Sequence, residues 1–545
     1  MDTQRLIIFA VFSLSLFMLW GKWEEINKPP VTTIENKTTY EKNTDVPKSD
    51  LAKTEEKKEA ASATTLNKGQ RIKVITDVVE AEIDLNGGDL RRYSLLKQKS
   101  DKDKSKPFVL FADEEPHNFI AQSGLIGQGL PNHKEIFTTD RNTYQLATNT
   151  ENLEVKLHWR SVNGIQVDKV YIFKRNSYVV QIKYEITNNS STAISPDAYF
   201  QFLRDGTPPE GHSALLPTYA GPAIYTEEKR FQKHEFSKVG KDGKDIEEDA
   251  NNGWIAVLQH YFLTAYLPQG NAQRKFYLKK IADNLYTSGV IIPVGEIATK
   301  STKNIKMELF AGPLEQESIK NLAPGLELAV DYGWLKIIAV PIFTLMSLIH
   351  KLLGNWGWTI IVLTIVIKMA FYPLSAASYR SMAKMKALAP RLQRLKEQYG
   401  DDRQKQHQAM MDIYKTEKIN PLGGCLPVVI QIPVFIALYW VLLYSVEMRQ
   451  APFALWIHDL TAQDPYYVLP VLMGISMLVQ ARLNPTPPDP IQAKIMMIMP
   501  VAFSIMFFWF PAGLVLYWVV NNVLSIAQQW RINHVLQNVP KKAKR

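Results

Sequence analysis

Long apolar stretches separated by short polar loops fill the C-terminal part of the sequence, and they constrain the fold more than any other feature. Stretches of roughly 17–25 apolar residues can cross a bilayer as α-helices. Residues 356–376, 421–444, 465–483 and 514–530 have this character, and the stretch 495–510 is slightly shorter. Another apolar stretch, 335–353, is interrupted by Lys336, Pro341, His350 and Lys351. We therefore predict a helical membrane protein in which residues 323–355 form an amphipathic helix lying in the membrane interface.

The last two apolar stretches could form one long helix or a hairpin. A continuous helix over residues 495–530 would be about 54 Å long, which far exceeds the ~30 Å hydrocarbon core of a bilayer. Pro511, Ala512 and Gly513 separate the two stretches, and proline close to glycine marks a turn. The sequence therefore predicts two spans joined by a tight turn at 511–513.

The N-terminus carries a further apolar stretch, residues 6–20, preceded by Arg5. The small-residue cleavage site of a secretory signal peptide is missing, because Gly21, Lys22 and Trp23 follow. This pattern predicts an uncleaved signal anchor over residues 1–22. Residues 23–68 are poor in large apolar side chains, so we expect a disordered tether.

Residues 69–322 show the alternation of apolar and polar side chains that is typical of β-strands. It is clear over 71–75 and 79–85, after which Asn86, Gly87 and Gly88 predict a turn. We expect a large all-β domain. We found no metal-ligand spacing, nucleophile elbow or phosphate loop in it, so neither an enzyme nor a cofactor is expected. The single cysteine, Cys425, lies in an apolar run, and no disulfide can form within the chain.

Charges in the loops predict the orientation of the spans. Residues 376–420 carry ten Lys or Arg against five acids, and the tail 531–545 is basic. The loop 445–464 carries Arg449 against Glu447, Asp459 and Asp464. Basic loops stay in the cytoplasm. We therefore expect six spans, cytoplasmic N- and C-termini, and a β domain in the periplasm.

Three further segments complete the predicted organisation. Residues 377–420 form a basic cytoplasmic hairpin of two helices, 381–398 and 402–418. Residues 445–464 form a periplasmic loop, and residues 484–494 form a cytoplasmic loop.

Lys368 is the most informative candidate for a functional site. It lies about 18 Å into its span, where a charge costs at least ~2.5–3.5 kcal/mol on insertion scales. No acid lies inside any of the six spans. Lys368 could extend toward the cytoplasmic surface, lose its proton, or face water within the membrane.

Polar residues on several spans favour a hydrated cavity around Lys368. Thr364, Lys368 and Tyr372 share one helix face by spacing. Tyr517, Asn521 and Gln528 share a face of the last span, while Gln431 and Gln480 add polar groups from two others. Methionines at 473, 477, 496, 497, 499 and 506 suit core packing, and they also suit a surface that accepts varied apolar sequences.

Four sequence motifs carry a resemblance to a known family. They are Gly354-Asn355-Trp356-Gly357 followed by Tyr372-Pro373-Leu374, residues 420–427 (NPLGGCLP), residues 451–460 (APFALWIHDL), and residues 509–517 (WFPAGLVLY). Together they resemble the YidC/Oxa/Alb family of membrane protein insertases. The N-terminal anchor, tether and β domain are similar to the layout of its Gram-negative members.

The resemblance implies a five-helix insertase core plus the N-terminal anchor, with a β-supersandwich in the periplasm. It also implies a bacterial inner-membrane insertase and folding chaperone, working through a hydrated, positively charged groove, alone or with the Sec translocon and its accessory subunits. Other implied partners are nascent membrane proteins, membrane lipids, and the ribosome through the basic loop and tail. Two positions depart from the family pattern. Lys368 stands where arginine is usual, and Trp518 stands where a second aromatic hydroxyl is usual beside Tyr517.

Two other functions remain open from the residues alone. An ion-coupled transporter would need acids inside the membrane or a broken-helix ion site, and the spans lack the acids. A membrane-tethered carbohydrate enzyme would need converging carboxylates or histidines in the β domain. It would also leave the later spans without a role.

Overall fold

The computed structural model describes residues 45–48, 66, 68–114, 117–209, 218–240, 245–400, 402–417, 426–483 and 490–538. The described chain forms two compact units. The first, called the β unit below, runs to Asp331 and includes residues 444–447. The second, called the helical unit, contains the rest of the described chain from Tyr332 onward. The predicted anchor 1–22, Cys425 and the last residues of the tail lie outside the described residues.

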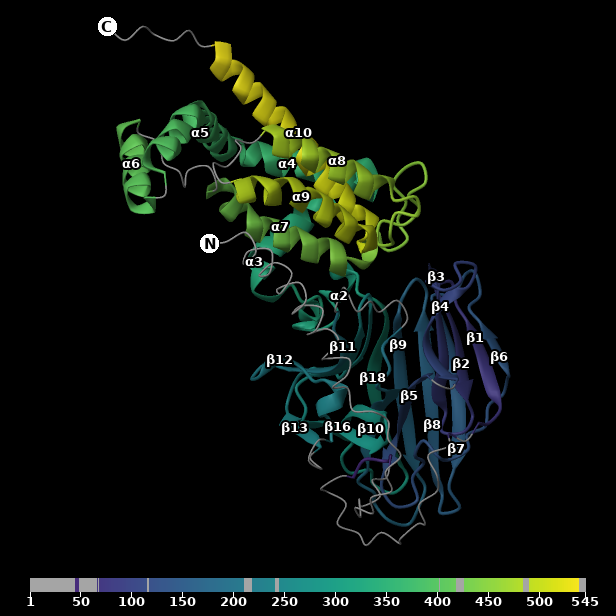
Figure 1. Ribbon diagram of the computed structural model, residues 1–545. Coiled ribbons are helices and arrows are strands. Elements are labelled where there is room, and N and C mark those ends of the chain that lie inside the picture. The colour runs from purple at the N-terminus through teal and green to yellow at the C-terminus, as the bar shows by residue number, and fades with distance from the viewer. Residues whose placement is uncertain are drawn as a thin grey trace. The chain divides into compact units, whose positions relative to one another are not determined.

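The β unit consists of two large sheets (Figure 1). The described strands of the ten-stranded sheet run in the order β13-β16-β17-β10-β5-β4-β3-β2-β1-β6, and those of the eight-stranded sheet in the order β12-β11-β14-β15-β18-β9-β8-β7. Neighbouring strands are antiparallel except for β1 and β6. The strands are β1 Arg71–Ile75, β2 Val79–Asp84, β3 Asp89–Lys99, β4 Pro107–Glu114, β5 His117–Ile126, β6 Thr143–Gln145, β7 Asn152–Arg160, β8 Ile165–Lys174, β9 Val179–Asn188, β10 Asp197–Asp205, β11 Ala220–Thr226, β12 Arg230–Lys233, β13 Ile246–Ala250, β14 Trp254–Gln259, β15 Phe262–Leu267, β16 Arg274–Ala282, β17 Leu285–Pro293 and β18 Ser301–Pro313. The prediction of a large all-β domain is confirmed.

Strand β10 shows how this unit is packed. Ala198, Phe200 and Phe202 belong to one apolar core with side chains from both sheets. Tyr199 and Gln201 point to the opposite face, because successive side chains of a strand alternate, and they are fully buried as well. The ten-stranded sheet is therefore covered on both faces along β10.

Part of the cover on the second face comes from the segment predicted to be a disordered tether. Residues 45–48 pack on the β unit, with Pro47 buried and Val46 against the sheet. The prediction of disorder for 23–68 is wrong at these four residues. The polar composition of the whole segment gives no sign of this short stretch, which has specific partners on the sheet.

A glycine at the entry to β14 allows a test of how closely the backbone packs against β11 in this unit. Gly253 has φ +98°, and a Cβ there would lie 1.9 Å from the carbonyl oxygen of Tyr225. We expect Gly253→Ala to destabilise the β unit by about 2–5 kcal/mol, through backbone strain and overpacking combined. Thermal unfolding of the full chain, followed by tryptophan fluorescence, measures this. Gly270→Ala is the matched control. Gly270 also has a positive φ (+71°), but a Cβ added there would have no other atom within 4 Å. Equal losses in the two variants would contradict the clash.

The helical unit contains α3 Lys336–Leu353, α4 Trp356–Ala370, α5 Tyr372–Tyr399, α6 Arg403–Thr416, α7 Leu426–Tyr444, α8 Val468–Leu483, α9 Pro490–Met506 and α10 Ala512–Asn538. The short helix α2 Gln316–Ile319 belongs to the β unit. Helix α10 is central to the helical unit, since it packs against α4, α5 and α8. Helix α9 packs on α8, and α3 packs on α4.

Lengths and compositions of the described helices can be compared with those of membrane spans. Gly333–Leu353 is long and apolar enough to cross a bilayer by itself. Trp356–Ala370 and Tyr372–Met385 reach this standard only together, with a bend of 66° between them. Ile430–Tyr444, Val468–Leu483 and Met497–Trp509 are apolar but shorter. The count of six spans and the interfacial placement of 323–355 therefore stay predictions.

The break after α4 corrects two predicted boundaries. Helix α4 ends at Ala370, so the predicted span 356–376 is not one straight helix. Helix α5 begins at Tyr372 and runs without a break to Tyr399, whereas the first hairpin helix was predicted at 381–398. Pro373 gives the physical reason, because proline suits the first turn of a new helix, while its missing N–H and its ring break a helix that would continue from α4.

The final hairpin differs from its prediction in length. Helix α9 begins at Pro490 rather than 495, and α10 continues to Asn538 rather than ending at 530. An apolar run marks only the part of a helix that is buried. The helix can continue beyond that run through polar residues such as Arg531. The turn between the helices is held in place, because Ala512 N donates to Ala462 O (2.7 Å) and Gly513 N donates to Leu460 O (2.8 Å).

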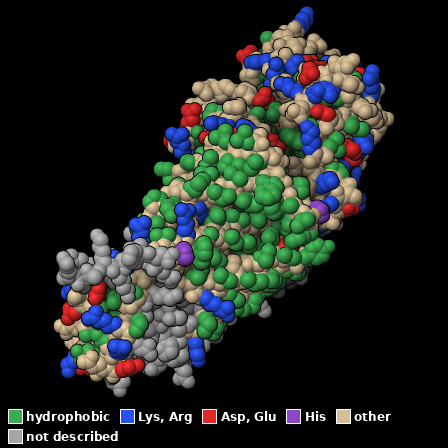
Figure 2. Space-filling view, turned by 90° about the horizontal axis from the view of Figure 1, so that it is seen from above, with side chains coloured by type: hydrophobic (Ala, Val, Ile, Leu, Met, Phe, Trp, Pro, Cys, Tyr) green, Lys and Arg blue, Asp and Glu red, His purple; other side chains and the backbone are tan. Residues whose placement is uncertain are grey.

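The helical unit exposes many large apolar side chains. Examples are Val471, Ile475 and Val479 on α8 and Ile498 and Val501 on α9, each at least 42% exposed. Figure 2 shows one face of the molecule with a broad continuous area of hydrophobic side chains and few charges within it. Apolar surface on this scale is typical of contact with a membrane or another protein.

Candidate functional site

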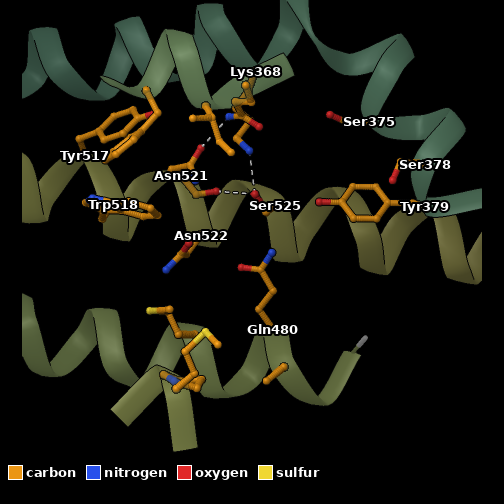
Figure 3. Close-up of a pocket in the computed structure, with 17 residues that line it drawn as sticks. Lys368, Ser375, Ser378, Tyr379, Gln480, Tyr517, Trp518, Asn521, Asn522 and Ser525 are labelled. Carbon is orange, nitrogen blue, oxygen red and sulfur yellow. Dashed lines mark hydrogen bonds between the residues drawn. The ribbon is translucent and has the colours of Figure 1, made fainter. Parts of the chain in front are cut away.

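A cavity of about 540 Å³ lies within the helical unit (Figure 3). It is lined by residues of α4, α5, α7, α8, α9 and α10: Lys368, Ser375, Ser378, Tyr379, Gln431, Ile432, Phe435, Met477, Gln480, Ala481, Met499, Pro500, Tyr517, Trp518, Asn521, Asn522 and Ser525. Polar and apolar side chains therefore share one space between helices that are far apart in the sequence.

Lys368 reaches from α4 toward α10 and is 6% exposed. Its Nζ donates a hydrogen bond to Ser525 Oγ (2.7 Å), and Ser525 Oγ donates to the backbone oxygen of Asn521 (2.7 Å). In the described part of the chain, no carboxylate forms an ion pair with Lys368. An ammonium group has three donors, and a neutral hydroxyl compensates its charge poorly. The positive charge therefore remains available to water or to an anionic group that enters the cavity.

Further polar groups come from the neighbouring helices. Gln431 Nε2 donates to Asn521 Oδ1 (3.4 Å), and Asn522 Nδ2 donates to Ser476 Oγ (3.1 Å). The indole nitrogen of Trp518 is buried without a hydrogen-bond partner among the described residues. A buried donor of this kind is normally satisfied by water or a ligand.

Aromatic rings form another part of the wall. The ring centroid of Phe435 lies 5.9 Å from that of Tyr517 and 4.5 Å from that of Trp518. Met477 and Met499 add flexible thioethers to the lining. The cavity thus offers one cation, several neutral hydrogen-bonding groups and adaptable apolar surface. Among the described residues that line it, none is an acid or a histidine that could act as a catalytic base.

The structure brings six of the predicted site residues together around this cavity: Lys368, Gln431, Gln480, Tyr517, Trp518 and Asn521. It does not bring Thr364, Tyr372 and Gln528 into the lining. The hydroxyl of Thr364 donates to Ile360 O (2.6 Å) in its own helix. The predicted face shared by Thr364, Lys368 and Tyr372 is wrong at Tyr372, because the break at Phe371 places Tyr372 on α5, where it is 40% exposed.

Sequence reasoning missed five polar residues of the lining: Ser375, Ser378, Tyr379, Asn522 and Ser525. Ser525 could have been found, since it follows Tyr517 and Asn521 at helical spacing on the same face. The α5 residues could not, because their approach depends on the 66° bend between α4 and α5. In Figure 3 the Tyr379 hydroxyl points toward Ser525.

Comparison with known proteins assigns both units. The family described as "YidC periplasmic domain" matches residues 71–345, and the family described as "60Kd inner membrane protein" matches residues 348–540. A protein of Methylobacillus flagellatus named "Membrane protein insertase YidC" is 53% identical, over 100% of this chain and 99% of its own length. The chain belongs to the YidC family. A YidC relative of the same name from Nitrosospira multiformis is 51% identical, over 98% of each chain.

Solved structures give more distant matches. A YidC crystal structure described as an active insertase with its first transmembrane domain resolved has a TM-score of 0.39 and 20% identity, over 85% of this chain and 92% of that chain. A galactose mutarotase related enzyme from Lactobacillus acidophilus has a TM-score of 0.31 and 9% identity, over 44% of this chain and 97% of that chain. Membership of the YidC family rests on the sequence matches.

Proposed function

We propose that this chain inserts hydrophobic segments of nascent proteins into the bacterial inner membrane, and that it assists their folding there. The cavity around Lys368 would serve as a hydrated, positively charged groove for the polar flank of the client. The observation that carries this proposal is the buried ammonium of Lys368, which has a hydroxyl rather than a carboxylate as its described partner. Relatives that match the whole chain are named membrane protein insertases.

The groove would act by lowering the barrier for the polar part of a client. A cation in a low-dielectric site attracts an acidic tail more strongly than it would in water. The adjoining apolar segment would leave between the helices into lipid, and its burial in hydrocarbon supplies the driving force. No covalent bond changes, so neither a cofactor nor a nucleotide is required.

The arrangement in the membrane forms part of the same proposal. Six spans would place both termini in the cytoplasm and the β unit in the periplasm. The excess of basic residues over 376–420 and in the tail supports this orientation. The exposed apolar side chains of α8 and α9 support lipid contact for those helices.

The proposed partners follow from charge and surface. Nascent membrane proteins and membrane lipids would contact the cavity and the apolar faces. Arg391 and Lys405 lie on the helical pair α5 and α6, whose basic surface suits ribosomal RNA or anionic headgroups. The Sec translocon and its accessory subunits would act beside the chain on some clients.

Photo-crosslinking to stalled nascent chains tests the groove directly. A crosslinking amino acid at Gln431 or Asn521 should capture the hydrophobic segment of a client during insertion, because both residues line the cavity. Val523 on α10 is the control position, since it is 52% exposed and is not part of the lining. Capture from Val523 alone would place the client path outside the cavity and would contradict the proposal.

A deletion tests whether insertion depends on the β unit. We expect a chain lacking residues 71–313 to insert clients nearly as well as wild type, because every described residue that lines the cavity belongs to a helix of the other unit. Residues 327–353 are kept so that α3 still supports α4. The measurement is growth of a strain depleted of its own insertase. Loss of growth at normal protein level would show that the β unit is essential.

A further inference from the structure

Residues 45–48 pack on the outer face of the ten-stranded sheet, and the side chains that receive them come from distant parts of the β unit. Pro47 is buried, and Val46 packs against Tyr199, Tyr277 and Ile291. These three residues belong to β10, β16 and β17, which are neighbours in the sheet. The segment therefore lies on a surface made by three adjacent strands.

The carboxylate of Asp45 has two basic partners. Its Oδ1 lies 2.7 Å from Lys134 Nζ, and its Oδ2 lies 3.1 Å from His133 Nε2. Burial by itself would raise the pKa of Asp45, but the hydrogen bonds and charges of His133 and Lys134 outweigh it and hold the pKa below its ordinary value. The carboxylate is thus bound in its charged form.

The orientation of His133 is set from inside the unit. The hydroxyl of Tyr199 accepts a hydrogen bond from the backbone N–H of His133 (3.0 Å) and lies 2.5 Å from Nδ1 of its ring. This contact fixes the ring so that its Nε2 faces Oδ2 of Asp45 (3.1 Å). His133 is 4% exposed. The ring is therefore held in position for an incoming carboxylate.

A second receptor group binds the backbone of the segment. Gln201 Nε2 donates to the backbone oxygen of Asp45 (3.1 Å) and to Gln122 Oε1 (3.0 Å), while Gln201 Oε1 accepts from the Tyr277 hydroxyl (2.7 Å). Gln122 in turn donates to Asp89 (2.9 Å). Every polar atom of the Gln201 amide is used, so its orientation is fixed by the β unit.

We propose that this face is a peptide-binding site of the β unit, and that residues 45–48 are its intramolecular ligand. The site takes a peptide in which an aspartate stands two positions before a proline. His133 and Lys134 bind the carboxylate, Gln201 binds the backbone oxygen, and Tyr199, Tyr277 and Ile291 accept the intervening apolar side chain. Docking attaches residues 45–48 to the β unit at a point in the sequence before its first strand.

Trypsin cleavage of the full chain after Lys48 tests the docking, because a protease must hold the residues before the cut in a free, extended form. Asp45→Asn should speed this cleavage by about tenfold through loss of charge-assisted hydrogen bonds. Val46→Gly, which keeps the charge, should also speed it. Asp283→Asn is the control, since its exposed side chain lies outside the site. Cleavage after Lys104 in the β3–β4 loop is the internal reference. Equal relative rates in all four chains would overturn the proposal.

A free peptide tests whether the face is a binding site. Replacing residues 45–48 by Gly-Ser-Gly-Ser in the full chain should empty it. The fluorescent peptide Asn-Thr-Asp-Val-Pro-Ala should bind that chain and not wild type, whose site is filled. The same peptide with Asn in place of Asp should bind about tenfold more weakly. No binding to the emptied chain, equal binding to both chains, or equal binding of both peptides would overturn the proposal.

Discussion

Reversing the charge at Lys368 should impair insertion most for clients with acidic tails. Two unit charges about 6 Å apart interact by about 3 kcal/mol at an effective dielectric constant of 20. Lys368→Glu turns that attraction into repulsion, so we expect insertion of acidic-tailed clients to slow by at least about tenfold. Lys368→Ala should be intermediate, because it removes the attraction without adding repulsion. Clients with neutral tails should suffer least.

Lys368→Arg is the matched control for this series. It keeps the positive charge in the cavity, and it should retain most of the insertion activity. Its planar group of five donors will contact Ser525 differently from an ammonium. The measurement is protease protection of clients with graded tail charge, inserted by each variant. If Lys368→Glu inserted acidic-tailed clients as fast as wild type, the cation would have no part in insertion.

Filling the cavity should block insertion without changing any charge. Gln480 points into the space from α8 opposite Lys368 (Figure 3). A tryptophan there would occupy much of the volume, and we expect Gln480→Trp to reduce the insertion rate by about tenfold, equivalent to about 1.4 kcal/mol in the barrier. Gln480→Leu removes the polar group at similar volume, and it should have a smaller effect.

The control for the cavity-filling variant lies one residue away. Val479 is 42% exposed and is absent from the lining, so Val479→Trp places the same ring on the outside of α8. It should insert clients like wild type. The rate of client insertion into vesicles, with each variant reconstituted at equal amounts, separates the two positions. Equal loss in both variants would indicate damage to α8 rather than a blocked cavity.

The sequence by itself determined the two-part organisation. Alternating side chains over residues such as 71–75 required strands, and an apolar run such as that after Trp356 required a buried or membrane helix. These patterns are local, because each depends only on which side chains of one helix or strand face an apolar environment. The motifs around Gly354, Pro421 and Pro511 identified the family for the same reason, since they are contiguous in the chain. The choice of Lys368 as a candidate site residue also followed locally, from one charge within an apolar run.

Only the tertiary structure decided which polar residues share the cavity and which do not. Spacing placed Tyr372 with Lys368, but the bend at Phe371 separates them and brings Ser378 and Tyr379 to the lining instead. Ser525 became the partner of Lys368 through the packing of α10 on α4.

The docking of residues 45–48 could not be predicted either. Its receptor groups, His133, Tyr199 and Gln201, lie far from Asp45 in the sequence. The physical reason is common to the cavity and the docking site. Helical and strand periodicity fix the direction of a side chain within its own element, while bends and packing between elements decide what that side chain meets.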